Sequence, residues 1–198
     1  MSTTYRTRKI LAVLISGKAG VGKSSLAKLI QERLDYMDGL VVRNVALASP
    51  IKALCYNQLG WNGEKDSKGR KLLQDIGKAG RDYDEDTWVV KLLEYVESNP
   101  LVLPHIVLID DWRFPNELEF IEKNPLYNVL TVRVEAPNRE SLKGTPEYND
   151  VSETSLPTAT DVTNYGFVVM NELTPKELLQ SALEIADYIT EKYIVKEN

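Results

Sequence analysis

Three glycines, two lysines and a serine lie close together near the N-terminus, in the stretch Gly17-Lys18-Ala19-Gly20-Val21-Gly22-Lys23-Ser24. The stretch fits the pattern of a phosphate-binding loop, which is a glycine, four free positions and then Gly-Lys-Ser. Because glycine tolerates positive φ and has no Cβ, consecutive backbone N–H groups can point at phosphate oxygens. Lys23 would place an ammonium near the β- and γ-phosphates, and the Ser24 hydroxyl would ligate Mg²⁺. The sequence therefore predicts binding of a nucleoside triphosphate.

The segments on either side of this loop support the same interpretation. The apolar run from Ile10 to Ile15 is typical of a buried parallel strand, and apolar residues after the loop recur at helical spacing. The alternative is an incidental glycine turn before a surface helix. Such a turn would require neither a buried strand before it nor a helix with an apolar face after it. The predicted nucleotide-binding residues are Gly17, Ala19, Gly20, Val21, Gly22, Lys23, Ser24 and Ser25.

A helix predicted over 68–82 carries a cationic face. At about 100° per residue, its apolar side chains share one side and its basic side chains share the other. The cationic face comprises Arg70, Lys71, Gln74, Lys78 and Arg81. Such a face is either solvated surface or, in a protein that binds a triphosphate, a site for a second phosphate group. We favour the second interpretation.

Two glycines, Gly77 and Gly80, interrupt the same helix. Alanine would be more favourable at each position by ~1 kcal/mol. We therefore expect another group to approach the helix backbone closely there, and the substrate is one candidate.

Carboxylates follow a second predicted buried strand, over 106–110. A parallel strand that ends in Asp110 and Asp111 places these carboxylates at the same edge of the sheet as the phosphate loop. One of the two would orient Mg²⁺, with Asp111 as the first choice, and Arg113 would enter the same cleft. The alternative is that the two acids only cap the turn before the next helix. His105, which precedes the strand, is expected to be structural.

The stretch 136–165 contains Pro137, Pro146 and Pro157 and many small polar residues. Irregular segments of this length are usually lids or disordered. We favour a lid, because phosphoryl transfer requires that water be excluded, and Arg139 would then bring a positive charge to the transferring group.

Composition limits the remaining possibilities. The chain has 198 residues, 43% of them hydrophobic, and a net charge of −5, which indicates one domain and argues against general affinity for nucleic acid or anionic membrane. No apolar stretch is long enough to span a membrane, and the N-terminus lacks the apolar core of a signal peptide, so a cytoplasmic protein is expected. The single cysteine, Cys55, excludes an intrachain disulfide and is expected to be buried.

Strand and helix signals alternate along the chain, which predicts an α/β fold with a parallel five-stranded sheet and helices on both faces. The expected strands are 10–15, 40–47, 106–110, 128–135 and 167–170. The expected helices after the loop helix are 50–59, 68–82, 84–98, 115–123 and 175–192. A helical region over 48–98 would bind the acceptor, within a single domain over 1–198.

In these motifs the chain resembles the deoxynucleoside monophosphate kinases of bacteriophages and related bacterial sequences, within the P-loop kinases. The resemblance covers nearly the whole chain and rests on the loop and four further segments. These are Ala48-Ser49-Pro50-Ile51-Lys52, Arg70 to Gly80-Arg81 with Trp88, Asp111-Trp112-Arg113-Phe114-Pro115-Asn116-Glu117, and Ser152-Glu153-Thr154-Ser155-Leu156 with Asn171. One departure is Asp150, where a histidine is expected.

The resemblance implies that ATP and Mg²⁺ are held by Gly22, Lys23 and Ser24, with Asn171 among the residues near the nucleotide. By the same resemblance, Lys52, Arg70, Arg81, Arg113 and Glu117 would surround the acceptor. Further expected acceptor-binding residues are Lys71, Gln74 and Lys78 of the cationic face, with Trp88 and Glu153 of the motif segments, and the expected catalytic residues are Lys23, Asp111, Arg113 and Arg139. Metal ligation would fall to Ser24 and Asp111.

The activity expected is transfer of the γ-phosphoryl group of ATP to a (deoxy)nucleoside monophosphate. A kinase of another small phosphorylated metabolite, such as phosphomevalonate, would share the phosphate-binding parts, and a non-catalytic nucleotide switch is the rival from a different class. A GTP switch should carry an Asn-Lys-x-Asp motif, which the sequence lacks. The base, the sugar and the oligomeric state are left open, with a homodimer as one option.

Overall fold

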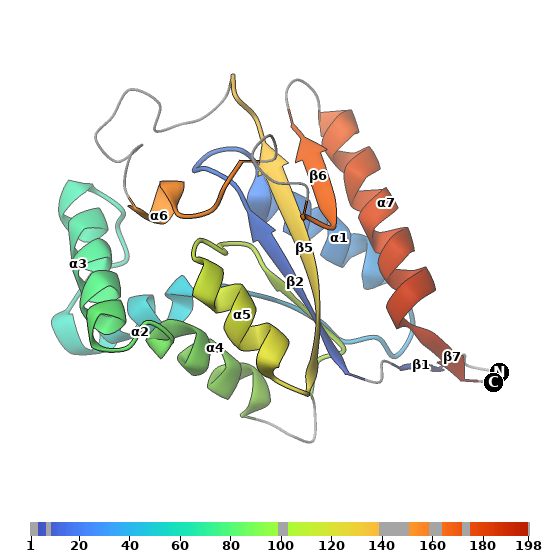
Figure 1. Ribbon diagram of the computed structural model, residues 1–198, viewed down its shortest axis with the longest axis horizontal. Coiled ribbons are helices and arrows are strands. Elements are labelled where there is room, and N and C mark those ends of the chain that lie inside the picture. The colour runs from blue at the N-terminus through green and yellow to red at the C-terminus, as the bar shows by residue number, and fades with distance from the viewer. Residues whose placement is uncertain are drawn as a thin grey trace.

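The computed structural model describes residues 4–6, 9–98, 103–138, 151–158, 164–171 and 175–197 (Figure 1). Its central sheet has five parallel strands in the order β3-β4-β2-β5-β6. The strands are β2 (Ile10–Ser16), β3 (Val42–Val45), β4 (Ile106–Ile109), β5 (Tyr127–Glu135) and β6 (Phe167–Met170). The predicted α/β fold with a parallel five-stranded sheet is confirmed, and the glycine-rich loop directly follows β2.

The strand β2 lies at the centre of the sheet, between β4 and β5. Leu11 is paired with Ile106 on one side and with Asn128 on the other. All seven residues of β2 are buried. Parallel strands covered on both faces carry near-continuous apolar runs, which is why this strand could be predicted from its composition.

Helices cover both faces of the sheet. On one face α1 (Lys23–Leu34) and α7 (Pro175–Tyr193) pack on alternate residues of β2, among them Leu11 and Val13. On the other face α4 (Thr87–Glu97) and α5 (Pro115–Lys123) pack on Ala12 and Leu14. Because the period along a strand is two residues, neighbouring residues of β2 belong to different halves of the core.

A helical region lies beside the carboxyl edge of the sheet, at the left of Figure 1. It consists of α2 (Ala48–Leu59), α3 (Ser67–Tyr83) and the start of α4. Its small core is formed by Ile51, Cys55 and Trp88. The expected burial of Cys55 is therefore confirmed.

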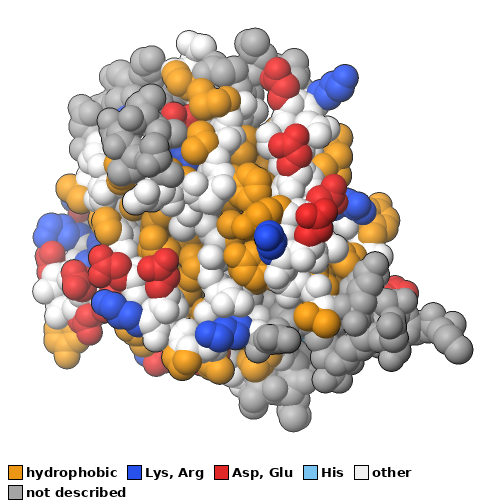
Figure 2. All heavy atoms as spheres, turned by 45° about the vertical axis from the view of Figure 1, so that its right-hand side comes forward, with side chains coloured by type: hydrophobic (Ala, Val, Ile, Leu, Met, Phe, Trp, Pro, Cys, Tyr) orange, Lys and Arg blue, Asp and Glu red, His pale blue; other side chains and the backbone are white. Residues whose placement is uncertain are grey.

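The edge strand β6 has helix cover on one face only. Val169 is buried among the residues that α7 covers, whereas about half of the surface of Val168 and of Met170 is exposed. Figure 2 shows apolar side chains among charged ones on the side of the molecule that turns toward the viewer.

Two features of the fold were not predicted. The strands β1 (Thr4–Arg6) and β7 (Val195–Glu197) pair antiparallel and bring the two ends of the chain together. The stretch expected to be irregular, 136–165, contains the short helix α6 (Val151–Thr154). The rest of that stretch lies partly outside the described residues, and Arg139 and Asp150 are among the residues not described. No described helix has the length and apolar character needed to cross a membrane.

Candidate functional site

The glycine-rich loop joins the end of β2 to the start of α1. Gly17, Gly20 and Gly22 have φ values of 144°, 83° and 101°, which L-residues with side chains rarely adopt. A Cβ on Gly17 would lie 2.3 Å from the Val134 carbonyl oxygen, and one on Gly22 would lie 2.3 Å from the Asn171 Nδ2 atom. The loop backbone therefore has the curled form that presents N–H groups to an anion, and its glycines are required by close neighbours.

The Lys23 ammonium is held by the loop itself. Its Nζ atom donates to the Gly17 carbonyl at 2.7 Å and to the Lys18 carbonyl at 2.8 Å. Burial, and to a smaller extent the nearby Arg113 guanidinium, lower the pKa of Lys23 to about 8, with Glu153 and two aspartates acting in the opposite direction. A bound phosphate would compensate this cost of burying the ammonium, since an anion favours the charged form.

Asn171 joins the phosphate loop to the end of β5 through two hydrogen bonds. Its backbone N–H donates to the Glu135 carbonyl at 2.8 Å, directly after β6, and its Nδ2 donates to the Val21 carbonyl at 2.8 Å. Asn171 is buried. The side chain that the resemblance places near the nucleotide thus fixes the position of the loop backbone.

A cavity of about 910 Å³ lies at the carboxyl edge of the sheet, between the loop, α2, α3, α4 and α6. It falls in the size range of small-molecule sites. Most of the predicted site residues line it. They are Ala19, Gly20, Lys23, Ser24, Lys52, Arg70, Gln74, Lys78, Arg81, Trp88, Asp111, Arg113, Glu117 and Glu153.

Some predicted residues are not among those that line this cavity. They are Gly17, Val21, Gly22, Ser25, Lys71 and Asn171. Val21 instead lines a second cavity of about 240 Å³ on the other side of the loop, with Lys18, Arg133 and Glu135.

The face of α3 that was expected to be cationic carries acids as well. Lys71 forms an ion pair with Asp75 at 3.0 Å, and Lys78 pairs with Asp82, each one helical turn apart. Asp75 and Asp82 line the cavity together with Lys78. Spacing of four residues between Lys and Asp is visible in the sequence and would have revealed this mixed character.

At Gly80 another group approaches the helix closely, as predicted, and that group is the Trp88 indole, whereas a Cβ on Gly77 would meet the Ile51 Cδ1 atom at 3.3 Å. A Cβ on Gly80 would lie 2.4 Å from the Trp88 Cζ2 atom. The indole Nε1–H donates to the Gly77 carbonyl at 2.9 Å. The glycines therefore fix α3 against α4, which places Arg81 at the cavity with its guanidinium carbon 4.4 Å from the centre of the Phe114 ring.

The Asp111 carboxylate is occupied by backbone donors. Its two oxygens accept the N–H groups of Leu47 at 2.7 Å and Ala48 at 3.0 Å, at the start of α2. Burial raises its pKa, and these two hydrogen bonds act in the opposite direction. Asp111 thus fastens α2 to the end of β4, a contact that neither the metal-orienting prediction nor the alternative of a cap on the following turn anticipated. Asp110 lines the cavity with Ser24 and Lys23, and no donor in the described part of the chain bonds its side chain.

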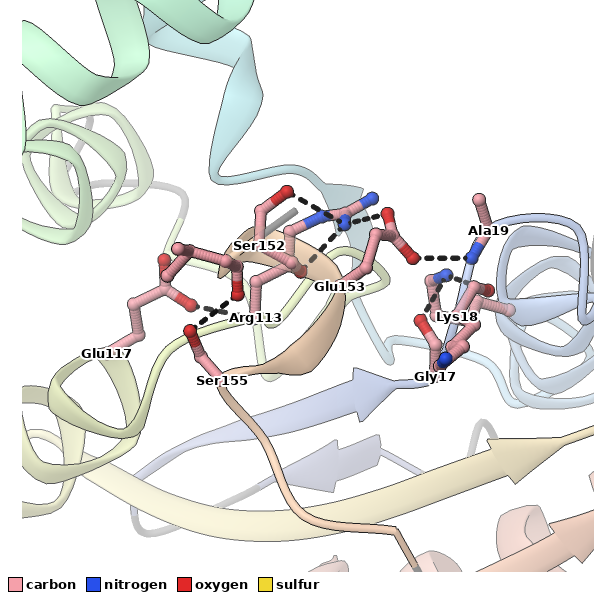
Figure 3. Close-up of polar contacts among 10 residues, drawn as sticks. Gly17, Lys18, Ala19, Arg113, Glu117, Ser152, Glu153 and Ser155 are labelled. Atoms are coloured by element: carbon pink, nitrogen blue, oxygen red, sulfur yellow. Dashed lines mark hydrogen bonds and ion pairs between the residues drawn. The ribbon is translucent and has the colours of Figure 1, made fainter. Parts of the chain in front are cut away.

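Figure 3 shows the polar contacts that surround Arg113. Glu117 holds the backbone of this residue, because its Oε2 accepts the N–H groups of Arg113 at 2.9 Å and Phe114 at 3.0 Å. Burial raises the pKa of Glu117 to about 7. The Arg113 guanidinium in turn donates to the Ser152 carbonyl at 2.9 Å and to the Glu153 carboxylate.

Several residues that line the cavity were not among the predicted site residues, and five of them have polar or aromatic side chains. Lys65, Asp75, Asp82, Phe114 and Ser152 all line it. The motif segments contain Asp75, Phe114 and Ser152, but no rule of spacing separates side chains that face a cavity from side chains that face solvent.

A metal ion in this cavity would need ligands from a bound nucleotide as well as from the protein. Among the described residues, no group of three or more His, Cys, Asp or Glu side chains is arranged to hold one. Mg²⁺ is usually bound by one or two protein oxygens together with substrate phosphates and water. Ser24 and Asp110, which line the same cavity, fit that arrangement.

A scan against protein-family models and a search of curated proteins each gave no match. Among solved structures, the chain is similar to the APS kinase CysC of Mycobacterium tuberculosis, with 15% identity and a TM-score of 0.47 over 91% of this chain and 97% of that one. It is also similar to the shikimate kinase of Aquifex aeolicus, with 14% identity and a TM-score of 0.47 over 91% and 99%. At this level of similarity, function has to be inferred from the site itself.

Proposed function

We propose that the protein transfers the γ-phosphoryl group of ATP to a nucleoside or deoxynucleoside monophosphate. The proposal rests on one observation: the phosphate loop and basic side chains from other elements line the same cavity. These basic residues are Arg70 and Arg81 of α3 and Arg113 after β4. Such an arrangement offers one site for the donor phosphates and one for an acceptor that is itself charged.

On the donor side, the loop N–H groups and Lys23 would bind the β- and γ-phosphates. Ser24 and Asp110 would hold Mg²⁺, which when bound neutralises charge on those phosphates. Asp111 acts on this side only through the backbone, since both of its oxygens accept N–H groups of α2.

On the acceptor side, the guanidinium groups of Arg70, Arg81 and Arg113 would orient the monophosphate. A phosphate oxygen is already a nucleophile, so the reaction needs positioning and charge stabilisation more than a general base. Trp88 fixes the helix from which Arg81 extends. The role given to Arg139 at the transferring group stays a prediction.

The proposal is tested by measuring ADP release against a panel of ribo- and deoxyribonucleoside monophosphates, with phosphomevalonate as the metabolite alternative. At least one nucleoside monophosphate should raise ADP release well above the rate with ATP alone. If none does, the proposed function is wrong, and a response to phosphomevalonate only would favour the metabolite kinase.

Two variants of the same helix localise the acceptor site. Arg81→Ala should lower kcat/KM for the monophosphate about tenfold to a hundredfold, because a charge-assisted hydrogen bond contributes about 1.5–3 kcal/mol, while the KM for ATP stays nearly unchanged. Lys71→Ala is the matched control, since Lys71 does not line the cavity and pairs with Asp75. Equal kcat/KM in both variants would remove Arg81 from the acceptor site.

A further inference from the structure

The Glu153 carboxylate occupies a donor of the phosphate loop. One oxygen accepts the backbone N–H of Ala19 at 2.8 Å, and the other pairs with the Arg113 guanidinium (Figure 3). Only 6% of the Glu153 side chain is exposed. The two contacts join α6, at the far side of the cavity, to the loop and to the end of β4.

The contact to Ala19 is one that a phosphate oxygen could make in the same way. Backbone N–H groups in a curled glycine-rich loop form a concavity that binds anions, and a carboxylate oxygen is an anionic acceptor as a phosphate oxygen is. Lys23 is also engaged internally, because its ammonium donates to two loop carbonyls. One N–H group of the loop and the Lys23 ammonium are thus engaged by the chain's own groups.

We propose that Glu153 is an internal competitor for nucleotide. Its carboxylate takes the Ala19 amide in the nucleotide-free protein, and the triphosphate displaces it on binding. The proposal rests on the proposed function, because it assigns the loop to a triphosphate and Arg113 to the acceptor.

Displacement of Glu153 has a second effect. The same carboxylate pairs with Arg113, so its displacement removes the charged partner of the guanidinium and leaves the Ser152 carbonyl, a neutral acceptor, to compete with the acceptor phosphate in the cavity that these residues line. The donor would therefore increase the affinity for the acceptor, and by linkage the acceptor would increase the affinity for the donor by the same factor.

The competitor weakens the apparent affinity for nucleotide. A ligand that binds only the open form has an apparent Kd equal to the intrinsic Kd divided by the open fraction. If the carboxylate leaves the Ala19 amide free in about a third to a tenth of the molecules, the apparent Kd is raised about threefold to tenfold.

The test is titration calorimetry with the non-hydrolysable analogue AMPPNP and Mg²⁺. Glu153→Gln removes the charge that attracts both Arg113 and the loop, so it should bind AMPPNP about threefold to tenfold more tightly than the wild type. Glu119→Gln on α5 is the matched control, because Glu119 is exposed and pairs only one turn away with Lys123, and it should bind as the wild type does. Equal or weaker binding by Glu153→Gln overturns the proposal.

A second variant guards against loss of folding. Glu153→Asp keeps the charge but shortens the side chain by one methylene, so it reaches Ala19 less well and should also bind AMPPNP more tightly. Circular dichroism shows which variants are folded. If the wild type does not bind AMPPNP, the proposed function fails as well, whereas wild-type binding with no gain in either Glu153 variant overturns the competitor role alone.

Discussion

Replacing Gly80 by alanine should destabilise the protein, against the intrinsic preference of a helix. Alanine is favoured over glycine in a helix interior by ~1 kcal/mol. The new Cβ would lie 2.4 Å, 2.5 Å and 2.7 Å from Cζ2, Cε2 and Nε1 of Trp88, whereas carbon atoms in contact prefer about 3.5–4.0 Å. The indole or the helix must therefore move by roughly 1 Å or more.

The Trp88 ring has little freedom to move. It is buried, packs with Ile51 and Cys55, and donates to the Gly77 carbonyl at 2.9 Å. Overpacking costs about 1–3 kcal/mol and a broken buried hydrogen bond about 1–3 kcal/mol. After subtraction of the helix preference, the expected loss in the free energy of unfolding is about 3 kcal/mol, within roughly 1–5 kcal/mol.

Urea unfolding followed by circular dichroism measures this loss. Because Gly80 and Trp88 are in contact, the substitution should cost at least about 1 kcal/mol less in a Trp88→Leu background, where the ring is gone. A Gly80→Ala protein as stable as the wild type would refute the argument that the indole, rather than a ligand, requires glycine at position 80.

Three further predictions concern charged groups. Asp110→Asn should raise the Mg²⁺ concentration needed for half-maximal activity. Asp111→Asn should leave that concentration unchanged and lower the free energy of unfolding by about 1–3 kcal/mol, because its hydrogen bonds to the backbone are lost. Equal Mg²⁺ titrations of the two variants would contradict the assignment of Asp110 to the metal. Burial raises the pKa of Glu117 to about 7, so the folded protein binds more protons than the unfolded chain. The free energy of unfolding should therefore fall as the pH rises from about 5 to 8, by at most about 3 kcal/mol. Glu117→Gln should remove that fall, which urea unfolding at both pH values would measure. Because the pKa of Lys23 is lowered to about 8, AMPPNP affinity should decrease as the pH rises from 7 to 9.5, and a flat calorimetric profile would count against a charged Lys23 at the phosphates.

The sheet was predictable because its signal is local. Buried parallel strands such as 10–16 and 106–109 are continuous apolar runs, and the glycines of the loop must follow the first of them. The pair β1 and β7 was not predictable, since strands of three residues at opposite ends of the sequence, with Thr4 paired to Glu197, leave no periodic pattern.

The candidate site was predictable at the level of elements and less so at the level of atoms. The sequence placed Asp110 and Asp111 at the correct edge, but it could not say which carboxylate the α2 backbone would occupy, because that depends on where Leu47 and Ala48 lie in space. For the same reason the contact between Glu153 and Ala19, which are 134 residues apart, had no sequence signal.

The antiparallel pairing of β1 with β7 places both chain ends side by side, at the lower right of Figure 1 and away from α3 and α6. Neighbouring strands lie about 5 Å apart, and each residue of an added linker spans up to about 3.5 Å, so a few residues would join the ends. New ends could then be opened in the exposed turn after α1, at Tyr36. In such a circularly permuted chain the phosphate loop would lie near the C-terminus and would be synthesised late. Nucleotide binding by this chain would show that the loop needs its local geometry and does not need to be synthesised first.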